Sequence, residues 1–168
     1  MAFESLTDEK IQQLIECPKR VTNAQARTKL KEGHEQTNYK VTSIDGSNLE
    51  FELYKRRNLR EGMSDDFSCG IAWIAPNGEL VTLARYNGSS HTHCNQLERG
   101  KLGYNTHIHK ATERYLRANK KAEGFAEITA RYNTLNGALH CLVVDCNISG
   151  ITTTSDVTNQ INLFNNEP

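Results

Sequence analysis

The chain has 168 residues, and 37% of them are hydrophobic, which suits one domain with a single core and gives no case for two. Its 20 basic residues balance its 20 acidic residues, so the overall charge excludes nucleic-acid binding by bulk attraction alone. The first residues lack the basic start and apolar run of a signal peptide, and no stretch is long and apolar enough to span a bilayer.

A helix is predicted over about residues 7–17. Thr7 is a good N-cap, two acidic residues follow it in the first turn, and the apolar residues after them recur at helical spacing. Pro18 ends the pattern. The polar stretch 19–38 has little periodicity, so it is predicted to be a connector.

Strands are predicted next, in a sheet over about residues 39–110. An Asp-Gly pair at 45–46 is a strong hairpin signal, and the nearly continuous apolar run at 67–74 is typical of a central strand. Residues 87–106 are rich in Gly, Ser, Asn and charge, which predicts a long surface loop. We expect residues 107–110 to return to the sheet as a short strand.

The clearest helix is predicted over about residues 134–147. Five apolar residues form a stripe at helical spacing, after an Asn or Thr that can cap the helix. The Thr- and Asn-rich stretch 148–168 is expected to be a flexible tail. Together these elements predict a single α+β domain over residues 1–168, with an antiparallel sheet of about four to six strands flanked by N- and C-terminal helices.

Four of the six histidines lie within nineteen residues, in two His-x-His pairs: His91 with His93, and His107 with His109. Side chains two apart in a strand point to the same face, so each pair would present two imidazoles together. Histidine exchanges protons near neutral pH and is the commonest transition-metal ligand. The cluster therefore predicts a functional site.

The first interpretation of the cluster is metal-independent cleavage of RNA. Between residues 85 and 121, eight basic residues stand against two acidic ones, a local field that suits a phosphodiester. His107 and His109 are the candidate base and acid, and Arg85 is the candidate cation that stabilises the reacting phosphate. The candidate phosphate-binding residues are Lys110, Arg114 and Asn87, and further candidates for the site are His91 and His93.

Two other interpretations stay open. His91, His93, His107 and His109 are of the residue type that binds zinc, but their spacing matches no specific metal motif. In that case zinc would be the cofactor, whereas the ribonuclease interpretation needs none. The third interpretation is a non-enzymatic binding or inhibitor protein, such as a phage-encoded factor that acts against a host defence.

Four motifs resemble an uncharacterised family of small bacterial and phage proteins. They are Leu6-Thr7-x-Glu9 followed by Pro18-Lys19, Arg85-Tyr86-Asn87-Gly88, His107-Ile108-His109-x-Ala111-Thr112-Glu113-Arg114-Tyr115, and Asp145-Cys146-Asn147-Ile148. The resemblance covers most of residues 5–148. It implies an architecture and not an activity.

A second resemblance covers about the central third of the chain. Arg85-Tyr86-Asn87, followed by a histidine-rich loop and a His-x-His strand, is similar to the TumE type of toxin, for which the fold of RelE-like ribonucleases is expected. This resemblance implies that Arg85, His107 and His109 form the site. The chain departs from the pattern in having Asn87-Gly88 where the toxins often have Asp-Asn, and in being longer at both ends.

The partners expected on this basis are RNA or another phosphate-bearing ligand, with a protein antitoxin or a host-defence target as the protein partner. No membrane partner is expected. Five cysteines without a Cys-x-x-Cys pair fit a reducing compartment, so a cytoplasmic location is expected.

Overall fold

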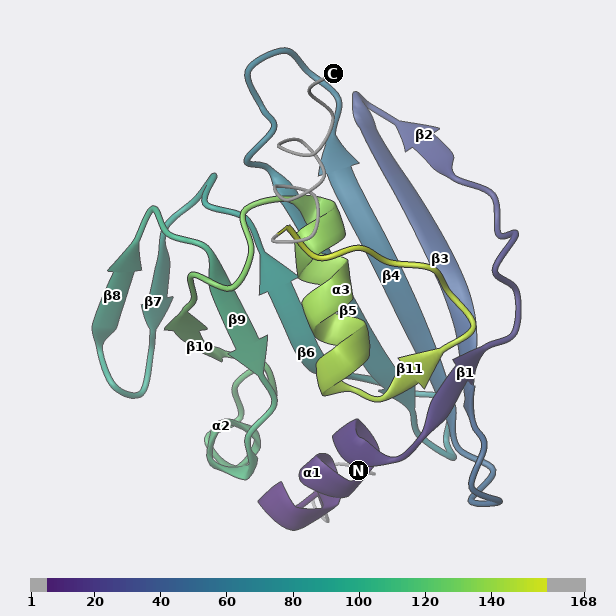
Figure 1. The fold of residues 1–168 in the computed structure, drawn as a ribbon. Helices are drawn as coiled ribbons and strands as arrows, with labels where there is room; N and C mark the ends of the chain where they lie inside the picture. Colours follow the sequence, from purple (N-terminus) through teal and green to yellow (C-terminus); the bar gives the residue numbers. More distant parts are fainter. Residues whose placement is uncertain (1–5, 157–168) are drawn as a thin grey trace.

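A computed structural model describes residues 6–156 of the chain, and Figure 1 shows the arrangement of its helices and strands. In chain order the elements are α1 (Asp8–Glu16), β1 (Lys19–Val21), β2 (Lys29–Lys31), β3 (His34–Ser43), β4 (Glu50–Asn58), β5 (Phe67–Ile74), β6 (Leu80–Asn87), β7 (His93–Asn95), β8 (Gly100–Gly103), β9 (His107–Lys110), α2 (Glu113–Arg117), β10 (Phe125–Ile128), α3 (Leu135–Asp145) and β11 (Ile148–Ser149).

One large sheet contains nine of the strands, in the order β10-β9-β6-β5-β4-β3-β1-β11, with β2 paired to β3. Its pairs are antiparallel except for β1 with β11, which is parallel. The strands β7 and β8 form a separate hairpin. This hairpin stands beside β9 and β10 at the left of Figure 1.

The predicted fold class is wrong. Strands hold 38% of the described residues and helices 17%, so this part of the chain is mostly sheet rather than a balanced α+β domain with four to six strands between two flanking helices. The stretch 19–38, predicted to be a connector, supplies β1, β2 and the start of β3. Two of these strands lack the alternation of apolar and polar residues that predicts a strand. All residues of β2 are exposed, and the first residues of β3 are half-buried.

Other expected elements correspond to observed ones. The helices expected at about 7–17 and 134–147 are α1 and α3. The side-chain oxygens of Thr7 and Thr134 cap them by accepting hydrogen bonds from the backbone N–H groups of Lys10 and Gly137. Of the expected tail, residues 148–149 form β11, and residues 157–168 lie outside the described residues.

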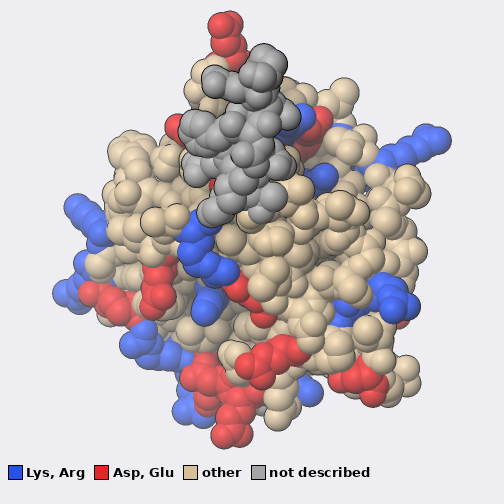
Figure 2. Space-filling view, viewed as in Figure 1, with Lys and Arg blue, Asp and Glu red and all other residues tan. Residues whose placement is uncertain are grey.

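One face of the sheet packs against α3, which lies across β4, β5 and β6 (Figure 1). Successive side chains of a strand alternate between faces, and on this face they are apolar. The most deeply buried of these strand side chains are Phe51, Leu53, Ile71 and Leu83, and the most deeply buried large side chain of α3 is Leu142. On the outside of this layer, acidic and basic side chains are interspersed (Figure 2).

The opposite face of the sheet is polar, and α3 does not cover it. Gly70 in the central strand β5 faces this side, and a Cβ atom there would lie 2.8 Å from the ring of Tyr54 on β4. The glycine therefore lets the tyrosine ring lie close against the sheet, next to Arg85 on β6. We call this polar side the open face; it carries Arg85, Asn87, His107 and His109.

Lys19, on β1, connects the C-terminal ends of α1 and α3 to the sheet through hydrogen bonds. Its side chain is fully buried, and its ammonium Nζ donates to the carbonyl oxygens of Ile15 (2.7 Å), Cys17 (2.8 Å) and Cys146 (2.9 Å). These carbonyls lie at the C-terminal ends of α1 and α3, where helices leave acceptors without intrahelical donors. One cation thus satisfies both helix ends.

Candidate functional site

The four clustered histidines converge on the open face. The ring of His107 lies 5.0 Å from that of His109, 5.6 Å from that of His93 and 5.2 Å from that of His91, measured between centroids. The rings of His93 and His109 are 4.5 Å apart. The His-x-His spacing on β9 accounts for one pair, and the β7–β8 hairpin brings the other pair over it.

Backbone carbonyls fix the tautomers of the two imidazoles on β9. Nδ1 of His107 lies 2.8 Å from the carbonyl oxygen of Asn105, and Nδ1 of His109 lies 2.8 Å from that of Glu123. A carbonyl oxygen can only accept, so both Nδ1 atoms carry the proton and both Nε2 atoms have a free lone pair. The side chain of Asn87 donates to Nε2 of His107 (3.3 Å).

Arg85 and the surrounding burial keep these two imidazoles neutral. The side chains of His107 and His109 are 0% and 1% exposed, and an Arg85 Nη2 atom lies 3.5 Å from Nε2 of His109. Burial, and then the charge of Arg85, lowers the pKa of His109 to about 3. Burial also lowers the pKa of His107, and the neighbouring histidines and Arg85 lower it further. Near pH 7 neither ring carries a proton charge.

The other two imidazoles have access to solvent. His91 is exposed and His93 is half-buried. Nε2 of His93 lies 3.0 Å from both the side-chain oxygen of Asn95 and the carbonyl oxygen of Gly124, so it carries the proton, and Nδ1 is free to accept one. Nδ1 of His91 lies 3.4 Å from the hydroxyl of Ser90.

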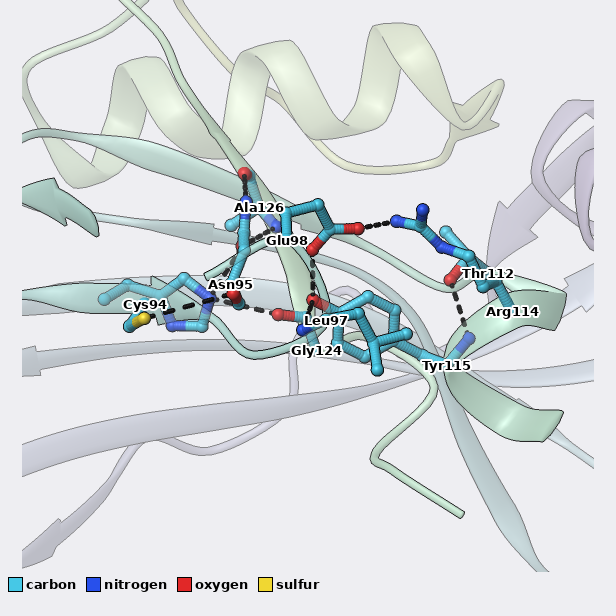
Figure 3. Close-up of polar contacts among 10 residues, drawn as sticks. Cys94, Asn95, Leu97, Glu98, Thr112, Arg114, Tyr115, Gly124 and Ala126 are labelled. Atoms are coloured by element: carbon cyan, nitrogen blue, oxygen red, sulfur yellow. Dashed lines mark hydrogen bonds and ion pairs between the residues drawn. The ribbon is translucent and has the colours of Figure 1, made fainter. Parts of the chain in front are cut away.

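The β7–β8 hairpin is fastened to the sheet by side chains (Figure 3). The amide of Asn95 donates to the carbonyl of Ala126 and accepts from its N–H, each at 2.8 Å, as a neighbouring strand would. At the far side of the hairpin, the carboxylate of Glu98 accepts from the hydroxyl of Tyr115 (2.7 Å) and pairs with Arg114. The prediction of a long surface loop over residues 87–106 is therefore wrong: the segment contains the strands β7 and β8, and these contacts hold it beside His107.

Replacement of Asn95 by alanine is expected to release the hairpin from β10. Asn95 is 6% exposed, and its loss leaves the buried N–H and carbonyl of Ala126 without partners, which costs about 1–3 kcal/mol per group. The amide of Ala126 should then exchange hydrogen at least about tenfold faster, at roughly 1.4 kcal/mol per factor of ten. Asn105→Ala, which removes an exposed side chain bonded to Leu102, is the control. Equal exchange rates in the two variants would show that Asn95 does not hold the hairpin.

Two buried polar atoms on β6 have no hydrogen-bond partner among residues 6–156. They are Nε of Arg85 and Oδ1 of Asn87, and the side chains that carry them lie two apart on the open face. Buried donors and acceptors are nearly always satisfied. An unsatisfied donor beside an unsatisfied acceptor is the arrangement that a bound polar ligand completes. The next residue, Gly88, cannot be replaced by a residue with a side chain without a shift of the backbone, because a Cβ atom there would lie 2.1 Å from the carbonyl oxygen of Asp65.

The structure gathers some of the candidates and separates others. It brings Arg85, Asn87 and the four histidines together. Lys110 does not join them, because it follows His109 on β9 and so points to the face of α3, where its charge acts on Asp145. Arg114 does not join them either, since it is paired with Glu98.

The zinc interpretation finds no arranged ligand set in the part of the chain that the structure describes. No group of three or more His, Cys, Asp or Glu side chains there is placed to hold a metal ion. The Nε2 atoms of His107 and His109 instead face hydrogen-bond donors, from Asn87 and Arg85. A metal would have to displace both donors.

Sequence reasoning missed two residues beside the cluster. The carboxylate of Asp66 accepts a hydrogen bond from the hydroxyl of Ser90 (3.4 Å) and lies 3.5 Å from Nε2 of His34. It thus connects the first residue of β3 to the segment that carries His91. Tyr54 was visible only as a polar-side residue of an alternating strand, and its place over Gly70 depends on strand register.

Comparisons with protein-family models, with curated proteins and with solved structures find no match to the chain. Within residues 6–156, none of the helices has the length and apolar character needed to cross a membrane.

Proposed function

We propose that the protein is a metal-independent endoribonuclease whose substrate phosphate binds at Arg85. The observation that carries the proposal is the unsatisfied, buried Nε of Arg85, whose guanidinium contacts His109 in the cluster of four imidazoles. A guanidinium with a free N–H is suited to a phosphate oxygen. Histidine side chains of the same cluster that reach solvent are suited to exchange protons with the substrate.

The proposed reaction is transfer of the phosphate to the adjacent ribose oxygen. A base removes the proton of the 2′-hydroxyl, the 2′-oxygen attacks phosphorus, and the bond to the 5′-oxygen breaks as an acid protonates that oxygen. The products are a 2′,3′-cyclic phosphate and a free 5′-hydroxyl. Arg85 would stabilise the negative charge that grows on the non-bridging oxygens.

Solvent access supports His91 and His93 as the two groups that exchange protons. His93 has a free Nδ1, and His91 lies exposed beside it. His107 and His109, buried beneath them, would act as positioning residues that hold Asn87 and Arg85. The assignment of His107 and His109 as base and acid, made from the sequence, stays a prediction, and the same assay tests it.

The test is incubation of the purified protein with a mixed RNA pool in excess EDTA, with the ends of the products mapped. Fragments with 2′,3′-cyclic phosphate ends are expected, and His91→Gln should reduce their rate of formation on the order of 10²-fold, as loss of a general acid or base does. His140→Gln, which removes a half-buried histidine on α3 outside the cluster, should leave the rate unchanged.

Two results would overturn the proposal. One is the absence of cleavage by the unaltered protein, which would leave the non-enzymatic binding protein as the interpretation and turn the search to protein partners. The other is equal cleavage by His91→Gln and His140→Gln. Loss of cleavage in a folded His107→Gln variant with His91→Gln fully active would restore the assignment made from the sequence.

A further inference from the structure

A hollow lies on the open face, away from the β7–β8 hairpin. It is a groove of about 540 Å³ between β2, β3 and β4, lined by four cationic side chains and one carboxylate. The cations are Lys29, Lys31, Arg56 and Arg60, and the carboxylate is that of Glu32.

The cations of the groove form no close ion pairs with the described carboxylates, although the charge of Arg56 acts on Asp66 at longer range. No carboxylate among residues 6–156 lies within 4.0 Å of a charged nitrogen of Lys29, Lys31, Arg56 or Arg60. Arg60 donates instead to the backbone carbonyl of Glu32 (2.6 Å), which leaves its charge uncompensated. Four other arginines, Arg57, Arg114, Arg117 and Arg131, are each paired with a carboxylate. A concave site lined by unpaired cations concentrates positive potential and attracts anions.

A row of paired residues runs from this groove to the histidine cluster on the same face. Lys29 pairs with Gln36, Gln36 with Arg56, and Arg56 with Ser68. Ser68 then pairs with Asn87, and Asn87 with His107. Neighbouring strands lie about 4.8 Å apart, so the four steps from β3 to β9 span roughly 19 Å. The row carries no carboxylate, whereas Asp66 lies to one side of it, against His34.

We propose that this groove binds the backbone phosphates of a single-stranded nucleic acid whose next segment reaches Arg85. The inference rests on the proposed function for the identity of the strand as RNA. A single strand can follow a row of side chains across a sheet, with phosphates on cations and bases on aromatic rings. Tyr54, which lies on the open face between Arg56 and Arg85, offers such a ring.

Binding of a fluorescent twelve-nucleotide single-stranded DNA, measured by anisotropy at several salt concentrations, tests the groove. DNA has no 2′-hydroxyl and cannot undergo the proposed cleavage, so binding is measured separately from reaction. The double variant Lys29→Gln with Lys31→Gln should bind about tenfold more weakly, and its plot of log K against log salt should be shallower by about 1.4, at about 0.7 per lost phosphate contact. Lys10→Gln with Lys120→Gln removes the same charge from exposed sites on α1 and after α2, and should change neither quantity.

The possible outcomes distinguish the proposal of a binding groove from the proposal of a ribonuclease. Equal weakening of the two double variants, no binding of the oligonucleotide, or equally tight binding of the corresponding duplex overturns the groove. Groove-dependent binding without RNA cleavage by the unaltered protein supports the groove and overturns the nuclease. Cleavage that persists while the groove variants bind like the control overturns the groove alone.

Discussion

Replacement of Lys19 by methionine is expected to lower the free energy of unfolding by about 3–5 kcal/mol, the usual effect of removing one partner from a buried charged network. The methionine fills much of the same volume but cannot donate. Three carbonyl oxygens that now accept from Nζ, those of Ile15, Cys17 and Cys146, would lose their donor. The ring of Phe51, 4.9 Å below the ammonium, would also lose a cation–π contact.

Urea unfolding followed by the fluorescence of Trp73 measures this change. Trp73 is the single tryptophan, and it is buried in β5. The control is Arg20→Met, at the exposed neighbouring position on β1, which should change the stability by no more than about 0.5 kcal/mol. Similar losses in the two variants would contradict the role of Lys19 at the helix ends.

The second large effect is a loss of stability in mild acid, caused by the buried imidazoles. His109 has a pKa of about 3 in the folded protein and about 6.5 in an unfolded chain. Between these values the unfolded chain binds a proton that the folded protein does not, so falling pH favours unfolding. His109 therefore contributes its full stability above about pH 6.5, and loses roughly 1.4 kcal/mol per pH unit below it. His107, whose pKa is also lowered, acts in the same direction.

Urea unfolding at several values between pH 5 and pH 7 measures this loss, in a range where exposed carboxylates stay ionised. His109→Gln is expected to be less stable at pH 7, because it loses the bond to Glu123, and to have a pH slope smaller by about 1.4 kcal/mol per unit. His140→Gln should keep the slope of the unaltered protein. Parallel curves for the unaltered protein and His109→Gln would contradict a neutral, buried His109.

Local signals in the sequence identify the elements whose faces differ in polarity. The capped, periodic stretches at 7–17 and 134–147 correspond to α1 and α3, and the apolar run at 67–74 corresponds to β5. The strands at 29–31 and 93–95 could not be found this way. All three residues of 29–31 are exposed, and the strand 93–95 has three polar or small residues of different burial. Their strand conformation comes from pairing with partners rather than from an alternating pattern.

For the site, the sequence indicates which residues take part but not how deeply their side chains are buried. The His-x-His spacing predicts that His107 and His109 share a face with Arg85, and register places them opposite Asn87 and Arg85. Their burial depends on a hairpin held by Asn95 and Glu98. Such contacts join residues that are far apart in the sequence, as Asn95 and Ala126 are. A local sequence pattern therefore cannot predict them.

The amide of Asn95 also protects the sheet from self-association. β10 is an edge strand, and edge strands expose N–H and carbonyl groups that can pair with a strand of another molecule. By occupying both backbone groups of Ala126, Asn95 removes a pairing position at the middle of a four-residue edge. At the other edge β11 has only two residues, too few to recruit a neighbouring chain. The edges at β10 and β11 thus offer few free backbone groups to a strand of another molecule.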